Sequence, residues 1–344
     1  DGSVNGLVAN DFRIFKKLFD YDFKPIESAL GIDCFTQISN YKAIVKKDLM
    51  YNHNVSEKVR ALSKKLEAAK DEQEFFDVVT GFYKAYGVGM FGLNKAFRIE
   101  EHLDGGFSFM PINNMDAVML DDLIGYEIQK KKLTDNTEAF VHGKKANNVL
   151  LFGDSGTGKS TSIKAIVNQY YDDGLRMIEI YKHQFKYLSK IIAAIKNRNY
   201  RFIIYMDDLS FEEHEIEYKF LKAVIEGGVE TKPDNILIYA TSNRRHLIKE
   251  TYSDRGSDDL HRNDTMQETL SLSDRFGLAV NFSVPDKENY LEIVRSLANE
   301  KGLEIDIETL ENEAEQWALE RGGRSPRCAK QFVAIAEARQ LKNN

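Results

Sequence analysis

The sequence predicts an α/β protein: a parallel sheet of five strands covered by helices, preceded by a mostly helical segment and followed by a helical one. Between residues 148 and 284, short apolar runs alternate with amphipathic stretches, which is typical of a parallel sheet buried on both faces. Residues 153–160 (GDSGTGKS) fit the phosphate-loop pattern G-x-x-x-x-G-K-[ST]. We expect three domains, at residues 1–115, 116–285 and 286–344.

The composition is that of an ordinary globular protein. The 344 residues are 42% hydrophobic, and 47 basic against 54 acidic residues give a net charge of -7, so bulk charge does not indicate nucleic-acid binding. Cys34 and Cys328 stand alone, which argues against a disulfide framework and against structural zinc. No apolar run approaches the ~20 residues of a membrane span. We therefore expect a cytoplasmic protein that does not enter a membrane.

The first 115 residues carry no recognisable catalytic pattern. Residues up to about 86 have apolar side chains at helical spacing, as in 12–19 and 55–66. Residues 87–92 (GVGMFG) match G-x-G-x-x-G, but they follow a helical pattern and not a strand, so we interpret them as a loop that needs glycine. Residues 96–99 and 107–110 flank a glycine-containing turn and predict a hairpin of unknown role.

The phosphate loop has the context that a true nucleotide site requires. An apolar run at 148–152 predicts the strand that enters it, and residues 161–170 predict the helix that leaves it. Its glycines let backbone N–H groups turn inward around a phosphate, Lys159 reaches the β- and γ-phosphates, and the Ser160 hydroxyl is a ligand for Mg²⁺. The residues expected to contact the nucleotide are Ser155, Gly156, Thr157, Gly158, Lys159, Ser160 and Thr161.

Polar residues follow two later strands of the predicted sheet. The apolar run at 202–206 ends in Asp207 and Asp208, and the run at 236–240 is followed by Asn243. Ligands of such sheets bind beyond the carboxyl ends of the strands. We assign Asp207 to Mg²⁺, Asp208 to orienting or deprotonating the attacking water, and Asn243 to holding that water. Taken alone, an acidic turn and a turn-forming Asn are the alternative interpretations.

The remaining segments supply the other strands and helices. Residues 176–180 and 278–284 predict two further strands, and the chain from 286 onward is helical. Residues 210–213 (SFEE) resemble a capping box that begins a helix ending at Gly227 and Gly228. His214 lies at that helix start without a second ligand at helical spacing, so we do not expect a metal there. Residues 251–266 are polar and predict a mobile surface excursion.

Together these patterns resemble the AAA+ ATPases from about residue 119 to residue 340. The amino-acid sequence around residues 147–153 and 271–277 is most similar to an uncharacterised bacterial AAA+ group known only as a domain of unknown function. Most members have Glu where Asp208 stands, and the Asp-Asp pair is similar to that of replication initiators and helicase loaders. The resemblance rests on six elements in the family's order: Leu123-Ile124-Gly125, the Walker-A loop at 153–160, the Walker-B pair Asp207-Asp208, the sensor-1 Asn243, Arg275, and Ser325-Pro326-Arg327 at the sensor-2 position.

The resemblance implies that ATP lies between the core and the C-terminal lid, with Leu123, Ile124 and Gly125 near the adenine. It also implies an oligomer, because Arg275 would act on a neighbour's ATP; Arg255 and Arg262 are alternatives for that role. The expected function is an ATP- and Mg²⁺-dependent ATPase that remodels or loads an unidentified macromolecule. An ATP-gated oligomerisation switch is the alternative, and a small-molecule kinase is disfavoured. The residues implied in catalysis are Lys159, Asp208, Asn243, Arg275 and Arg327, and those implied in metal binding are Ser160 and Asp207.

Overall fold

The computed structural model describes residues 2–39, 53–87, 89–212, 215–226, 233–245, 247–249 and 275–343. The chain divides into two compact units, residues 1–94 and 95–344. The boundary that we expected near residue 115 differs from this division, because the predicted hairpin pairs with the sheet of the second unit. In the described residues no helix is both long and apolar enough to cross a membrane.

The first unit is helical. α5 begins at Asp71, whose side chain accepts a hydrogen bond from the backbone N–H of Glu74, and aromatic contacts of Phe12 with Phe75 and Phe76 join it to α1. Gly87 and Gly89 have φ of 73° and 78° and follow α5, so the stretch does not have the strand that a dinucleotide site requires before it. The loop predicted for residues 87–92 is wrong in its second half, because Met90, Phe91 and Gly92 lie in the short helix α6. The helices are α1 (Gly2–Phe19), α2 (Lys24–Leu30), α3 (Cys34–Ser39), α4 (His53–Ala68), α5 (Glu72–Tyr86) and α6 (Met90–Leu93).

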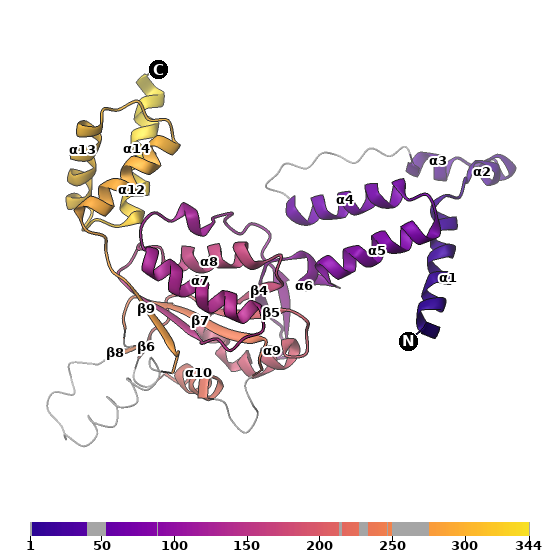
Figure 1. Cartoon of the computed structure of the whole chain (residues 1–344), viewed down its shortest axis with the longest axis horizontal. Coiled ribbons are helices and arrows are strands. Elements are labelled where there is room, and N and C mark those ends of the chain that lie inside the picture. Colours follow the sequence, from indigo (N-terminus) through magenta and orange to yellow (C-terminus); the bar gives the residue numbers. More distant parts are fainter. Residues whose placement is uncertain are drawn as a thin grey trace. The chain divides into compact units, whose positions relative to one another are not determined.

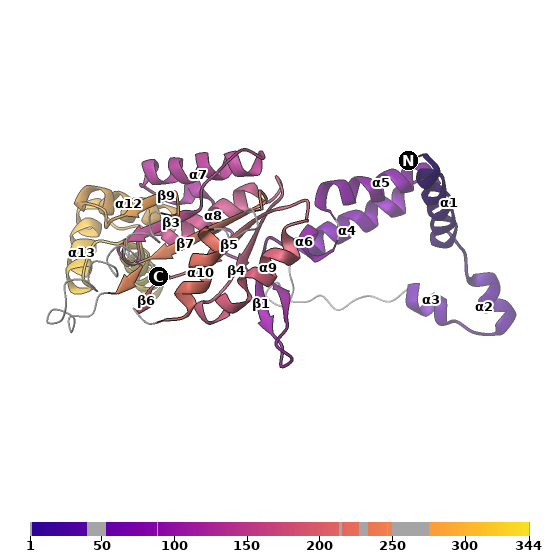
Figure 2. The same ribbon diagram turned by 90° about the horizontal axis from the view of Figure 1, so that it is seen from below.

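Among its described residues, the second unit has a main sheet of seven strands in the order β2-β1-β4-β5-β7-β3-β9, and β6 and β8 form a separate two-stranded sheet. The five parallel strands that the sequence predicted are present, but the predicted total of five is wrong, because the hairpin β1–β2 extends the sheet beyond β4 (Figure 2). The strands are β1 (Ala96–Glu101), β2 (Phe107–Pro111), β3 (Val149–Gly153), β4 (Leu175–Glu179), β5 (Arg201–Met206), β7 (Ile236–Ser242) and β9 (Leu278–Phe282).

Helices cover both faces of this sheet (Figure 1). α7 (Glu127–Val141) and α8 (Lys159–Tyr170) pack on one face, and α9 (Leu188–Ile195) and α10 (Glu217–Glu226) lie on the other. Short 3-10 helices, Leu120–Asp122 and Lys182–Tyr187, precede α7 and α9. The parallel core with helices on both faces, expected for an AAA+ protein, is confirmed.

One predicted helix start is wrong. Phe211–Glu212 form a short strand, β6, that pairs with β8 (Ile248–Lys249), and α10 begins only at Glu217. The pattern SFEE suggested a capping box, but Phe211 is fully buried and its N–H donates to the carbonyl of Leu247, so tertiary packing decides the local structure. His214, the pair Gly227 and Gly228, and residues 251–266 lie outside the described residues.

Three helices at the C-terminus form a lid with its own core (Figure 1). They are α12 (Lys287–Glu300), α13 (Ile307–Glu320) and α14 (Pro326–Asn343). Asp286 and Asp306 cap the first two helices, each accepting a hydrogen bond from a backbone N–H three residues later. The buried hydroxyl of Tyr290 on α12 donates to the carbonyl of Ala314 on α13 at 3.1 Å, which adds a polar contact to the apolar packing.

We predict that Phe97→Ala destabilises the second unit by about 3–5 kcal/mol, because this side chain is fully buried and lies on β1, the strand that joins the hairpin to β4. Met110→Ala on β2 is the control, and since Met110 is 47% exposed we expect a loss of less than about 1 kcal/mol. Denaturant unfolding of the full chain measures both. Equal effects of the two changes would show that the hairpin does not belong to the cooperative core.

Candidate functional site

The phosphate loop joins β3 to α8, as predicted. Gly153, Gly156 and Gly158 have φ of 128°, 79° and 96°, the left-handed region that glycine adopts without strain. A Cβ at Gly153 would lie 2.3 Å from the carbonyl oxygen of Phe282, so glycine is required where β3 pairs with β9. Lys159 is the first residue of α8, and the free N–H groups at a helix start attract anions.

Lys159 is held at the centre of the site. Its side-chain nitrogen donates to the carbonyl oxygens of Gly153 and Asp154, at 2.8 and 2.6 Å, and to Oδ1 of Asn243 at 3.2 Å. Burial lowers the pKa of Lys159, and the negative charges of Asp154, Asp208 and Asp207 oppose that shift. The ammonium group is therefore largely removed from water, where its interaction with a bound phosphate is strongest.

The acids after β5 meet the phosphate loop. Ser160 donates its hydroxyl proton to Oδ1 of Asp207 at 2.7 Å, and Thr241, at the end of β7, donates to the same oxygen at 2.5 Å. Burial raises the pKa of Asp207, but the hydrogen bonds that it accepts outweigh burial, and the net pKa lies below the ordinary value. Asp207 is thus a carboxylate at neutral pH, next to a hydroxyl of the phosphate loop.

Asp208 is oriented by β7. Its backbone has φ of 50°, and its N–H donates to the Thr241 hydroxyl oxygen at 2.9 Å. The Asn243 side-chain amide donates to Oδ1 of Asp208 at 2.8 Å while its own oxygen accepts from Lys159. Asn243 therefore links the lysine of the phosphate loop to the second acid, which the sequence assigned to the attacking water.

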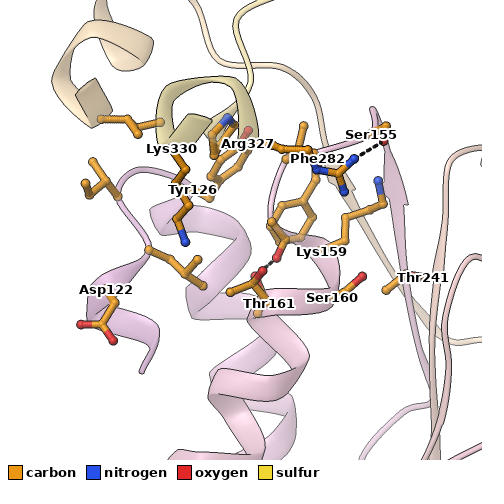
Figure 3. A pocket seen from close by; sticks show the side chains of 18 of the residues that line it. Asp122, Tyr126, Ser155, Lys159, Ser160, Thr161, Thr241, Phe282, Arg327 and Lys330 are labelled. Atoms are coloured by element: carbon orange, nitrogen blue, oxygen red, sulfur yellow. Dashed lines mark hydrogen bonds between the residues drawn. The ribbon is translucent and has the colours of Figure 1, made fainter. Parts of the chain in front are cut away.

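The lid contacts the phosphate loop from the other side of the pocket (Figure 3). Nη1 of Arg327 lies 3.4 Å from Oγ of Ser155, and the Arg327 backbone N–H donates to the carbonyl of Gly156 at 3.2 Å. A Cβ on Gly156 would approach Cβ of Arg327 to 3.0 Å. Close backbone approach between lid and loop is thus a second reason for glycine at this position.

The segment before α7 forms another wall. Leu123 packs against the core of the sheet and Ile124 against the core of the lid. Tyr126, at φ of 59°, stacks on Phe282 with ring centroids 5.1 Å apart, and its hydroxyl donates to the carbonyl of Ser283. Burial raises the pKa of Tyr126 to about 12, so this phenol is neutral. The wall presents apolar and aromatic surface to the pocket, which suits a nucleobase.

These groups surround a pocket of about 560 Å³. Two of the site residues that the sequence predicted, Gly125 and Arg275, are described by the structure but do not line the pocket. Arg275 is exposed in the turn before β9. Sequence reasoning missed Tyr126, Thr241 and Lys330, although each lies within three residues of a predicted site residue. The predicted residues that line the pocket are Leu123, Ile124, Ser155, Gly156, Thr157, Gly158, Lys159, Ser160, Thr161, Asp207, Asp208, Asn243 and Arg327.

The oxygen donors in the pocket fit a magnesium ion. Ser160 and Asp207 place a hydroxyl and a carboxylate oxygen 2.7 Å apart, and Mg²⁺ prefers one or two such protein ligands together with waters and substrate phosphates. Within the described residues there is no group of three or more His, Cys, Asp or Glu side chains that could hold a metal ion. This donor set does not resemble a zinc site, which would require nitrogen or sulfur ligands.

Parts of the chain are similar to known proteins. It is 34% identical over 75 residues to the replication factor C large subunit of Methanococcus vannielii, a match that spans 22% of this chain and only 15% of that protein. A variant of Thermotoga maritima RuvB has a TM-score of 0.43 at 20% identity, with 63% of each chain covered. The structure of Thermotoga maritima RuvB described as a Holliday junction branch migration motor has a TM-score of 0.39 at 16% identity, with 63% of this chain and 71% of that chain covered.

A family model matches a larger part of the chain. The match covers residues 93–340, from just before β1 to near the end of α14, and so includes the sheet, the pocket and the lid. The chain belongs to the family described as protein of unknown function (DUF815).

Proposed function

We propose that this protein is an AAA+ ATPase that binds ATP with Mg²⁺ in the described pocket and hydrolyses the bond to the γ-phosphate. The observation that carries the proposal is the hydrogen-bonded link from Lys159 through Asn243 to Asp208. It joins the cation that we assign to phosphate binding to the carboxylate that we assign to the attacking water. A pocket that only binds a nucleotide needs the cation but not the carboxylate.

Binding uses both sides of the pocket. The loop N–H groups and Lys159 hold the β- and γ-phosphates, and Arg327 adds a positive charge from the lid. Leu123 and Ile124, which line the pocket, are assigned to the adenine side, with Tyr126 contributing the aromatic wall. Gly125 lies between Ile124 and Tyr126 in the chain and does not line the pocket itself. Ser160 and Asp207 hold Mg²⁺, which when bound neutralises charge on the phosphates.

Hydrolysis is assigned to residues at the ends of β5 and β7. Asp208 orients the attacking water and accepts its proton. Asn243 holds the Asp208 carboxylate and the water in position for attack on the γ-phosphate. Thr241 fixes the turn between the two acids through its hydrogen bonds to both of them. Positioning by Thr241 and Asn243 lowers the entropic part of the barrier.

Arg275 requires a second subunit in this proposal. It is exposed and does not line the pocket of its own chain, so its assigned role as an arginine finger is directed at a neighbour's γ-phosphate. The protein is then an oligomer, and ATP turnover drives remodelling or loading of a macromolecular partner. Residues 255 and 262, the other candidate arginines, lie outside the described residues.

Lys159→Ala is expected to weaken ATP binding by about 10- to 100-fold or more, because charge-assisted hydrogen bonds to phosphate are lost. The matched control is Lys164→Ala on the same helix. Lys164 forms an ion pair with Asp116 and does not line the pocket, so this variant should bind ATP as the wild type does. Calorimetric titration with ATP measures both. Unchanged affinity in the Lys159 variant would contradict the assignment of the loop.

Asp208→Asn is expected to retain ATP and Mg²⁺ binding but to lower turnover by about 10²–10⁴-fold, because an amide cannot accept the proton. Phosphate release at saturating ATP measures the change. Asp207→Asn is the comparison, and we expect this variant to require a higher Mg²⁺ concentration. Wild-type turnover in the Asp208 variant would place the base elsewhere. Slow turnover already in the wild-type protein, together with strong nucleotide-dependent association, would favour the ATP-gated oligomerisation switch instead.

Arg275→Ala is expected to bind ATP normally and to lose turnover by about 10³-fold or more. Mixing it with the Lys159→Ala protein should restore part of the activity, because the lysine variant donates an intact arginine to a competent neighbouring site. Arg295→Ala, which removes an exposed lid arginine paired with Glu311, is the control and should keep full turnover. Absence of rescue, with specific activity constant on dilution, would show that each subunit acts alone.

A further inference from the structure

The ammonium group of Lys130 is held at the apolar wall of the pocket. Lys130 lies on α7 and lines the pocket, and its side chain is only 14% exposed. Its side-chain nitrogen donates to the carbonyl oxygen of Leu123 at 2.7 Å and forms an ion pair with Oε1 of Glu127 at 2.6 Å. Glu127 is 78% exposed and does not line the pocket, so the charge of this pair that belongs to the pocket is the positive one.

The turn that carries the Leu123 carbonyl is held in shape by the same lysine. Gly125 and Tyr126, which join Leu123 to α7, both have positive φ, at 76° and 59°. The Lys130 backbone N–H donates to the carbonyl of Tyr126 at 2.8 Å, and its side chain reaches back to Leu123. One residue of α7 therefore fixes both ends of the turn, and the carbonyl and the ammonium are placed side by side before a ligand binds.

Packing alone does not require an ammonium group at this position. A largely buried charge costs free energy, and an apolar side chain of similar length would cover the same surface without that cost. An ammonium has three donors, and among the described residues Leu123 and Glu127 engage two of them. A carbonyl oxygen accepts two hydrogen bonds, and Lys130 supplies one of them to Leu123. The pair can thus offer a ligand one donor and one acceptor, next to each other.

We propose that Lys130 and the Leu123 carbonyl recognise the edge of adenine that carries N7 and the 6-amino group. The inference rests on the proposed function, in which this wall holds the base of ATP. The third ammonium N–H donates to N7, and the 6-amino group donates to the Leu123 carbonyl. Adenine presents this acceptor and this donor side by side, whereas guanine presents two acceptors there, N7 and O6. The O6 atom of guanine would face the carbonyl oxygen, so the pair selects adenine.

The test is a double-mutant cycle between Lys130 and one atom of the nucleotide. Calorimetric titration of the full chain in the presence of Mg²⁺ compares ATP with 7-deaza-ATP, in which a CH group replaces N7. The wild type is expected to bind 7-deaza-ATP about tenfold more weakly than ATP, the effect of losing one hydrogen bond to a charged group. Lys130→Met should bind ATP about tenfold more weakly than the wild type and should no longer distinguish the two nucleotides.

Lys131→Met on the same helix is the matched control. Lys131 is exposed and does not line the pocket, so this variant should keep the wild-type affinity for both nucleotides. A merely structural role of Lys130 would give a different result, because a loosened wall weakens ATP and 7-deaza-ATP by the same factor. A ratio of the two affinities that stays at the wild-type value in Lys130→Met therefore overturns the inference.

GTP tests the part assigned to the Leu123 carbonyl, and the wild type should bind it about 10- to 100-fold more weakly than ATP. Equal affinity of the wild type for ATP and GTP, or for ATP and 7-deaza-ATP, overturns this inference alone, because nucleotide binding itself persists. Failure of the wild-type protein to bind ATP at all overturns the proposed function as well.

Discussion

The site depends on the side-by-side, parallel order of three strands, β5, β7 and β3. Their register pairs Met206 with Ala240 and Phe152 with Ser242, so the three strands end at one edge of the sheet. Parallel strands have all their carboxyl ends on the same side, and the loops that follow them converge there. Lysine, carboxylate and amide groups that are about 35 to 85 positions apart in the chain are thereby brought within hydrogen-bond distance.

Local patterns predicted the parts of this site that are governed by local chemistry. The phosphate loop needs glycine at fixed positions and a cation at the helix start, and these requirements are visible in eight residues. The order of strands in the sheet is a different kind of property. β1 pairs with β4, whose first residue comes 79 positions after the first residue of β1. No local sequence pattern indicates that β4 is the edge strand with which the hairpin pairs. The hairpin was foreseen, but not its place in the core.

Other features escaped prediction because tertiary packing determines them. Phe211 is buried by its pairing with Ile248, which outweighs the capping propensity of its neighbours. Alternation along a strand indicates that Tyr239 is buried, but only the folded structure shows that its hydroxyl pairs with Thr137 on α7. The assignment of Arg275 to a neighbouring subunit stays a prediction.

The backbone of Asp208 carries a further consequence. It adopts φ of 50°, a conformation that short side chains able to bond to their own main chain tolerate best, and longer ones less well. Its N–H also donates to the Thr241 hydroxyl, so the backbone angle and this hydrogen bond together fix the point from which the side chain extends. Exchange for glutamate would therefore have to suit this backbone conformation as well as add one methylene. The turn at this position therefore favours the shorter acid through its backbone geometry, whatever the carboxylate does chemically.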